Sequence, residues 1–229
     1  MIQLLQKNSL TVLNTFLAEK FSLNLCERQS TATITIGPEA PTISVGDWLR
    51  DTEDPGAGIV WRVKSVDTDY GGDTRTIQCE HMINSLKDMI MFGEITPEKM
   101  SGVKKAEECT AIQAVRYVLK QQSIWTLNTF AYSKSNPYSF NGDDLFSALE
   151  TVSSSLMDEW WSYDFSTYPF KLNITKKETE ASCEMRTDRN IQSLKKTVDR
   201  SRMFTRFFPI GKNNLKLDEK YISKNESVY

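Results

Sequence analysis

The chain has 229 residues, which is enough for one large domain or two small ones with a hydrophobic core. Apolar residues make up 39% and charged residues 25%, a composition in the range of soluble globular proteins. The 28 basic residues do not exceed the 30 acidic ones, so composition argues against tight nucleic-acid binding through the phosphate backbone.

The first 84 residues show the short alternation that is typical of β structure. Five runs alternate apolar and polar side chains, and turns rich in glycine, proline or aspartate separate them. We expect strands at 21–27, 31–37, 42–51, 58–70 and 74–82. Because no helical pattern interrupts these runs, they predict a small antiparallel barrel or sandwich. Of the two, the barrel leaves no open strand edge, so we expect a β-barrel.

The region from 85 to 195 has a mixed pattern. A short helix is expected at 83–92 and a polar loop at 94–105. Thr110 and Gln113 have the spacing of a capping box, which predicts that a helix begins there. Acids at the end of the segment 141–144 favour the start of a second helix. The predicted apolar faces comprise Ile112, Val115 and Leu119 in the first helix and Leu145, Leu149, Val152 and Leu156 in the second.

Three further strands are expected in the same region. One is at 125–133, and the runs 159–165 and 169–175 predict a hairpin with aromatic side chains on one face. Two helices packed on a small antiparallel sheet form an inserted α+β domain. The predicted fold class is therefore α+β, mainly β.

The chain returns to β structure at about residue 196. Alternation over 203–208 predicts a strand. Pro209 then removes a ladder donor, and Gly211 permits a tight turn. Alternation resumes at Leu215, so this stretch predicts two strands that begin a second β-barrel.

The letters of this stretch, TRFFPIGKNNL, resemble the signature Thr-Arg-(aromatic or Leu)-x-Pro-x-Gly-Lys of phage tail hub proteins. The matching positions are Thr205, Arg206, Pro209, Gly211 and Lys212. Other segments occur in the order that this family uses: CEHMINSLKDMI, AIQAVRYVL, FNGDDLFSALETVSSSL followed by EWWSYDF, and RNIQSLKKTVDRSRMFTRF. From about Cys79 onward the chain is similar to the tail-associated proteins often called prophage tail endopeptidases. These proteins are related in fold to the baseplate hub of contractile-tailed phages.

The resemblance implies a structural protein of the virion tail tip that forms a homotrimer. Each subunit would supply two barrels to a pseudo-sixfold ring, which joins the tail tube to the tip and lets DNA through. Implied partners are the distal tail or tube protein, the tape-measure protein, and a spike, lysin or receptor-binding protein. Assembly would take place in the host cytoplasm, without membrane insertion or a cofactor. The family's second barrel is longer, so we expect domains at 1–84 and 85–195 and a truncated one at 196–229.

The four cysteines, Cys26, Cys79, Cys109 and Cys183, are widely spaced and include no CxxC pair. A chain of this size does not need disulfides for a stable core. We therefore expect reduced and mostly buried thiols in a protein that assembles in a cytosol.

The segment Cys79-Glu80-His81 is where metal-ligating residue types gather. A zinc site needs three or four protein ligands, and no second cluster with suitable spacing appears in the sequence. His81 is the sole histidine, so it would have to be the base of any catalytic triad. We expect a hydrogen-bonded structural histidine, with neither a metal nor a triad.

Two alternative functions stay open from the residues alone. Asp158, Glu159 and Asp164 lie near aromatic residues, a pattern that can mark a glycoside-cleaving cleft or simply the polar positions of a strand. Asp158, Glu159 or Glu80 is the candidate acid of a cell-wall hydrolase. Trp160 and Trp161 are a candidate platform of a carbohydrate- or receptor-binding module. Longer family members carry a peptidoglycan-cleaving region after the hub, and no catalytic residue transfers from it to this chain. We therefore expect a protein that is not an enzyme.

Overall fold

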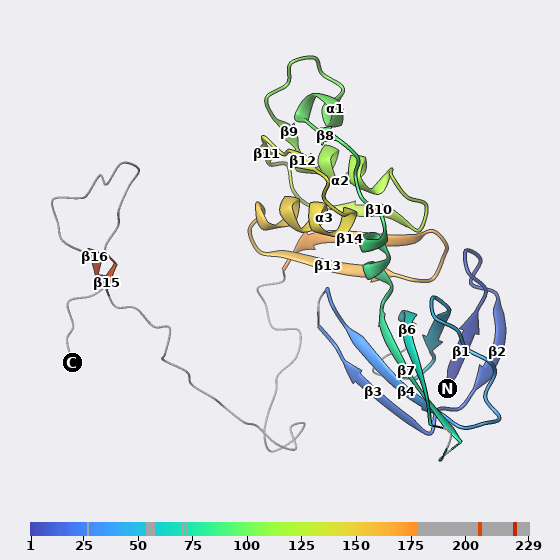
Figure 1. Ribbon diagram of the computed structural model, residues 1–229. Coiled ribbons are helices and arrows are strands. Elements are labelled where there is room, and N and C mark those ends of the chain that lie inside the picture. The colour runs from blue at the N-terminus through green and yellow to red at the C-terminus, as the bar shows by residue number, and fades with distance from the viewer. Residues whose placement is uncertain are drawn as a thin grey trace. The chain divides into compact units, whose positions relative to one another are not determined.

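The computed structural model describes residues 1–177, except 27, 54–57, 70 and 72, together with the two short strands Arg206–Phe207 and Ile222–Ser223 (Figure 1). The chain divides into two compact units, Met1–Thr179 and Glu180–Tyr229. No helix among the described residues is long and apolar enough to cross a membrane.

A seven-stranded sheet fills the N-terminal part of the first unit. Its strands are β1 (Ile2–Leu5), β2 (Val12–Phe16), β3 (Lys20–Asn24), β4 (Thr31–Ile36), β5 (Trp48–Asp51), β6 (Val60–Asp69) and β7 (Thr74–His81). The spatial order is β2-β1-β5-β6-β7-β4-β3, and every neighbouring pair is antiparallel. The five expected runs each overlap one of β3 to β7, whereas β1 and β2 were not among them.

The sheet is open, so the expectation of a closed barrel is wrong. Its order ends at β2 on one side and at β3 on the other. In an all-antiparallel sheet with an odd number of strands, the first and last strands run in the same direction. Closing seven strands would therefore require one parallel pair between β2 and β3, and the described residues contain no such pair.

The alternation of β4 explains how the sheet builds its core. Ala32, Ile34 and Ile36 are buried, and the threonines between them are exposed or half-buried. Ile34 and Ile36 join Leu49, Trp61 and Ile77 in one apolar cluster of this sheet.

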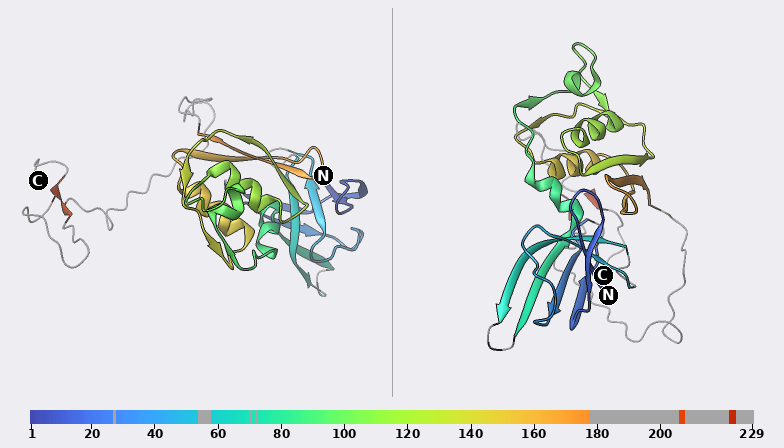
Figure 2. Two further views of the ribbon diagram at one scale, coloured as in Figure 1. Left: turned by 90° about the horizontal axis from the view of Figure 1, so that it is seen from above. Right: turned by 90° about the vertical axis from the view of Figure 1, so that its right-hand side faces the viewer.

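The remaining elements of the first unit form an α+β half. After the short 3₁₀ helix η1 (Met82–Asp88) come β8 (Glu94–Ile95), α1 (Pro97–Ser101), β9 (Cys109–Thr110), α2 (Ala111–Leu119), β10 (Trp125–Phe130), β11 (Ser135–Asn136), β12 (Phe140–Asn141), α3 (Leu145–Ser154), β13 (Glu159–Asp164) and β14 (Phe170–Lys176). Figure 2 shows this half, in green to orange, at one end of the blue-to-cyan sheet. Together the two halves confirm the α+β, mainly β class.

The capping residues in the sequence correctly predicted where both main helices, α2 and α3, begin. Thr110 and Gln113 form both hydrogen bonds of the capping box before α2. The Asp144 side chain accepts a hydrogen bond from the Ser147 backbone N–H at the start of α3. The expected polar loop at 94–105 instead contains β8 and α1. Pro97 in the first turn of α1 and left-handed Gly102 at its end are ordinary helix boundary signals.

The three-stranded sheet of this half is mixed, in the order β10-β14-β13. The expected hairpin is present as the antiparallel pair β13 and β14. However, β10 pairs with β14 in parallel, so the expectation of a purely antiparallel sheet is wrong. A parallel pair needs a crossover connection, and α3 lies in the chain between the two strands.

In the second unit the structure describes one antiparallel pair, β15 (Arg206–Phe207) with β16 (Ile222–Ser223). The expected strand at 203–208 includes β15. Of the signature positions, Arg206 lies in β15, whereas Thr205, Pro209, Gly211 and Lys212 lie outside the described residues, as does Cys183.

Candidate functional site

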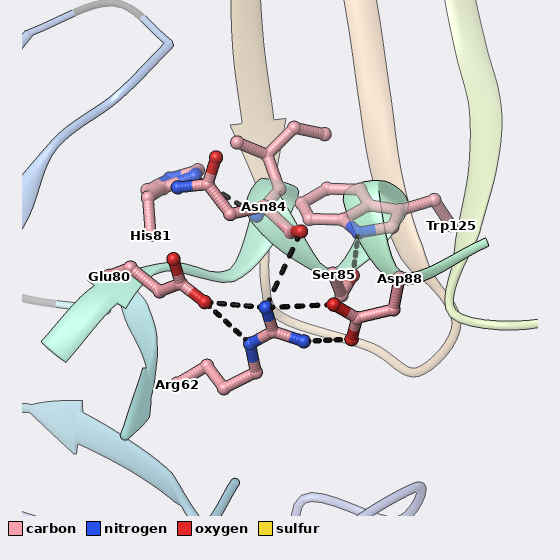
Figure 3. A network of polar contacts seen from close by, with 8 residues as sticks. Arg62, Glu80, His81, Asn84, Ser85, Asp88 and Trp125 are labelled. Carbon is pink, nitrogen blue, oxygen red and sulfur yellow. Dashed lines mark hydrogen bonds and ion pairs between the residues drawn. The ribbon is translucent and has the colours of Figure 1, made fainter. Parts of the chain in front are cut away.

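An arginine-centred network joins the seven-stranded sheet to the α+β half (Figure 3). Arg62 of β6 donates from Nε and Nη2 to Oε1 of Glu80 on β7, at 2.8 Å and 2.5 Å. Its Nη1 donates to Oδ2 of Asp88 at the end of η1, and its Nη2 donates to Oδ1 of Asp88 at 3.2 Å. Burial acts to lower the pKa of Arg62, but the hydrogen bonds to Asp88 and Glu80 outweigh it and raise that pKa. The guanidinium therefore stays charged and links three backbone segments.

The helix η1 is also fixed from the α+β side. The indole Nε1 of Trp125 on β10 donates to Oγ of Ser85 at 3.3 Å, and both side chains are buried. The backbone carbonyl of Asn84 lies 3.5 Å from Nη2 of Arg62. Because η1 begins directly after β7, these contacts set the direction in which the chain leaves the sheet.

His81 caps η1 and is a buried structural histidine, as the sequence indicated. Its Nδ1 accepts a hydrogen bond from the Ile83 backbone N–H at 3.2 Å, and the residue is 4% exposed. The imidazole lies 4.4 Å from the Tyr163 ring and 5.4 Å from the Phe165 ring, measured between centroids. Burial lowers the pKa of His81 to about 4, so the ring is neutral at physiological pH.

The two residues that precede His81, Cys79 and Glu80, have different surroundings. Cys79 is buried, and burial, followed by the nearby Glu80 charge, raises the pKa of its thiol to about 12. Glu80 lies on the opposite face and is bound to Arg62. Cys109 is buried and Cys26 is exposed, so the expectation of mostly buried thiols holds for the three described cysteines. No group of three or more histidine, cysteine, aspartate or glutamate residues in the described part of the chain is placed to hold a metal ion.

An open groove of about 760 Å³ lies between β13 and the seven-stranded sheet. Its lining is mostly apolar and aromatic, with a few polar side chains. The described lining residues are Leu25, Cys26, Ser30, Arg50, Gly58, Ile59, His81 and the run from Trp160 to Ser166. Nη2 of Arg50 lies 3.5 Å from the Phe165 carbonyl, and burial lowers the pKa of Arg50.

The two adjacent tryptophans of β13 do not form one platform. Trp160 is 40% exposed, whereas Trp161 is 1% exposed and donates from Nε1 to Oγ of buried Ser153 at 3.0 Å. Successive side chains of a strand point to opposite faces, which places one indole in solvent and the other under α3. The alternative in which Trp160 and Trp161 together form an exposed platform is therefore wrong for this pair.

The three candidate acids named from the sequence, Glu80, Asp158 and Glu159, are not among the described residues that line the groove. Glu80 is bound to Arg62, and Glu159 is bound to Arg28 at 2.6 Å. Asp158 has a left-handed backbone at the turn before β13. Among the described lining residues the one carboxylate is Asp164, and hydrogen bonds from Ser166 and then from Lys171 lower its pKa. A general acid needs a raised pKa, so this environment does not favour proton donation.

The residues that join the seven-stranded sheet to the α+β half were not predicted from the sequence. Alternation along β6 puts Arg62 on the face opposite Trp61 and Val63, but no pattern in the sequence indicates that Glu80 and Asp88 converge on it. The exposed strand β2 was also missed, although the uncharged run from Val12 to Leu17 was a signal that could have been found.

No protein-family model matches the sequence, and no curated protein matches it. Several solved structures share the fold, and two of them are tail proteins. The 43 kDa tail protein of prophage MuSo2 from Shewanella oneidensis superimposes with a TM-score of 0.62 at 14% sequence identity, over 90% of this chain. The tail protein from Neisseria meningitidis MC58 gives a TM-score of 0.59 at 12% identity, also over 90% of this chain. This chain spans 64% and 62% of the length of those two chains. The chain thus has a fold that is found in phage tail proteins.

Proposed function

We propose that this chain is a structural component of a phage or phage-like tail. The observation that carries the proposal is the fold shared with two phage tail proteins over 90% of the chain. The order of short motifs in the sequence, which resembles that of tail hub proteins, supports it independently. Within the tail we assign the chain to the hub or tail tip of the virion.

In this proposal the chain acts as a homotrimeric ring between the tail tube and the tip. Its partners are further copies of itself, the distal tail or tube protein, the tape-measure protein, and a spike, lysin or receptor-binding protein. DNA passes through the ring without specific binding during genome ejection, and the net charge of −2 suits a passage that does not retain DNA. Assembly takes place in the host cytoplasm.

We propose further that the chain is not an enzyme, although the tail-associated lysin family it resembles includes longer members with a cell-wall hydrolase region. The described residues that line the groove include one carboxylate, with a lowered pKa, and a neutral, buried histidine. The contacts of Arg62 join the seven-stranded sheet to η1 and do not hold a group in position to react.

Labelling of intact particles tests the location. Gold-conjugated antibodies raised against the 229-residue chain should bind one end of each tail in electron micrographs, at the end distal to the capsid. Label along the tail shaft, or at the capsid end only, contradicts the assignment to the tip.

Zymography on purified cell wall tests the proposal that the chain is not an enzyme. The purified chain should give no lytic band. A band that disappears in an Asp158→Asn, Glu159→Gln or Glu80→Gln variant, while the variant stays folded, supports the hydrolase instead.

A further inference from the structure

The groove between β13 and the seven-stranded sheet exposes large apolar side chains in a concave surface. Among its lining residues, Leu25 is 47% exposed and Trp160 is 40% exposed. Ile59, Tyr163 and Phe165 add further apolar or aromatic surface. The volume of about 760 Å³ lies within the range of protein binding sites, which is about 300–1,000 Å³. Apolar side chains gathered in a groove of this size indicate a site for a partner with an apolar surface.

The groove is built from one end of the seven-stranded sheet and from one strand of the α+β half. Leu25 and Ser30 lie in the connection between β3 and β4, Arg50 lies in β5, and His81 ends β7. The strand β13 lies across this end of the sheet (Figure 1). All of these residues belong to the first compact unit, so the described lining does not depend on the second.

Arg50 carries a positive charge into this groove, and no described carboxylate balances it. Its Nε is buried and has no hydrogen-bond partner among the described residues. Its Nη2 lies 3.5 Å from the Phe165 carbonyl, at the outer limit of a hydrogen bond. Burial lowers the pKa of Arg50, and no hydrogen bond or charge of a described residue opposes this effect. A half-buried charge without a partner costs free energy, and contact with a carboxylate of a ligand would reduce that cost.

The other half-buried arginines of the described chain have such partners. Arg62 is bound to Glu80, and Arg28 is bound to Glu159. Arg75 donates to three backbone carbonyls. The lack of a partner among the described residues is thus specific to the arginine that lines the groove.

His81 is a second lining residue with an unused donor. Its Nδ1 accepts a hydrogen bond from the Ile83 backbone N–H, so the proton of the neutral ring lies on Nε2. No hydrogen bond joins Nε2 to a described residue. Because the ring is neutral, it can donate to a ligand without adding a second positive charge.

The acceptors in the described lining, in contrast, already have donors. Oγ of Ser30 accepts a hydrogen bond from the Cys26 backbone N–H and donates to the Cys26 carbonyl. The Asp164 carboxylate accepts from the Ser166 backbone N–H and from Lys171. The groove therefore offers a ligand donors and apolar surface, which suits a ligand that carries an acceptor and apolar groups.

This chemistry fits a peptide better than a sugar. A sugar presents several hydroxyl groups that each need a hydrogen-bond partner, and a mostly apolar lining does not supply them. An apolar peptide segment with one acidic side chain matches both the walls and the charge of Arg50. Because the groove is open, a chain can pass along it, which favours a carboxylate within a segment over one at a chain end.

We infer that the groove binds a peptide segment of another tail protein, in which one acidic side chain lies between apolar side chains. The carboxylate pairs with Arg50, and the neighbouring apolar side chains cover Leu25 and Trp160. The inference rests on the proposed function, because a structural component of a tail needs surfaces that hold its neighbours.

A peptide array tests this binding with the full 229-residue chain. Each acetylated and amidated pentapeptide has Glu at its centre and Ala, Leu, Phe or Trp at the flanking positions. A second series has Gln at the centre, so the two series differ only in charge. Bound chain is detected through a C-terminal affinity tag, and fluorescence polarisation of the best-bound pair of peptides gives dissociation constants.

The wild-type chain should bind Glu peptides more tightly than the matched Gln peptides, by about tenfold or more. In Arg50→Met this ratio should fall to about one, because the charge that distinguishes the two series is removed. Arg116→Met is the matched control, since Arg116 is exposed on α2 and is not among the lining residues. It loses the same charge and should keep the wild-type ratio.

A change in the apolar wall should have a different effect. Trp160→Ala should weaken the binding of both series by about tenfold and leave the ratio between them unchanged, because the indole contributes contact area and no charge. Circular dichroism verifies that each variant is folded.

Three results would overturn the inference. If no peptide of either series binds, the groove does not accept an apolar segment. Equal binding of the two series by the wild-type chain, or a preference for Glu that persists in Arg50→Met, would show that Arg50 does not hold a carboxylate. Displacement of the peptides by peptidoglycan glycan strands without stem peptides would assign the groove to a sugar. Labelling of the tail tip decides the proposed function separately, since peptide binding is measured on the isolated chain.

Discussion

Arg62 holds three backbone segments with one side chain: its own strand β6, β7 through Glu80, and η1 through Asp88. The side chains of Arg62 and Glu80 are 19% and 17% exposed, whereas that of Asp88 is 57% exposed. The pair with Glu80 is therefore the better shielded of the two, and screening by solvent weakens the contribution of Asp88.

Removing the guanidinium should leave the Glu80 carboxylate without its partner in a shielded position. We expect Arg62→Met to lower the free energy of unfolding by about 1–3 kcal/mol. Urea unfolding measures this change. Lys64→Met, an exposed position on the same strand, is the control and should stay within about 0.5 kcal/mol of the wild type. Equal effects of the two substitutions would refute a special role for Arg62.

His81 predicts a pH dependence with a definite sign. Its folded pKa is about 4, below the ordinary value of 6.5, so the unfolded chain binds the proton more readily. The free energy of unfolding should therefore fall as pH drops through the window from about 6.5 to about 4, by about 2 kcal/mol between pH 7 and pH 5. Since His81 is the sole histidine, a His81→Asn variant should lose this slope. An unchanged slope in the variant would assign the effect to other groups.

At the scale of single elements, β13 places two adjacent tryptophans on opposite faces of the strand, one buried and one exposed. Trp161 packs 6.1 Å from the Phe146 ring of α3, measured between centroids, and Trp160 faces solvent. The sequence predicted that Trp161, Tyr163 and Phe165 share a face, because alternation along a strand is a local property. It did not predict which face the helices cover.

Truncation of the two tryptophans should therefore have unequal effects. Trp161→Ala should cost about 3–5 kcal/mol of unfolding free energy, because it leaves a cavity and an unpaired Ser153 hydroxyl. Trp160→Ala should cost about 1 kcal/mol or less, since its ring is already 40% exposed. Chemical denaturation of the two variants side by side measures both values, and a larger loss for Trp160→Ala would contradict this orientation of β13.

The helices could be predicted because residues next to them in the sequence determine where they begin. The strand pairings could not be predicted, because they depend on residues far away in the chain. The capping box before α2 and the acid before α3 are specified by neighbouring residues, so both helices were placed. The parallel pairing of β10 depends on β14, which is more than 40 residues away in the chain. The strands β1 and β2 lack clean alternation, because β2 is exposed on both faces.

At the scale of the whole molecule, the mainly β class followed from the alternating runs, but the openness of the sheet did not. Closure depends on the number of strands and their directions, and two strands were missing from the expected set. The convergence of Arg62, Glu80 and Asp88 depends on the register of β6 with β7 and on the course of η1. No local pattern contains that information.

Both apolar clusters of the first unit draw on described residues between Ile2 and Ile174. A chain shortened after Thr179 should therefore keep a single cooperative unfolding transition and the near-ultraviolet circular dichroism of its buried tryptophans. Urea titration followed by both signals measures this. Loss of the near-ultraviolet signal with retained secondary structure would show that residues after 179 are needed for packing.

The absence of any residue between β7 and η1 has a mechanical consequence. Strand and helix meet at His81 and Met82, and Arg62 and Trp125 brace the joint from its two sides. Because no unstructured segment separates the strand from the helix, we expect the sheet and the α+β half of the first unit to keep a fixed orientation.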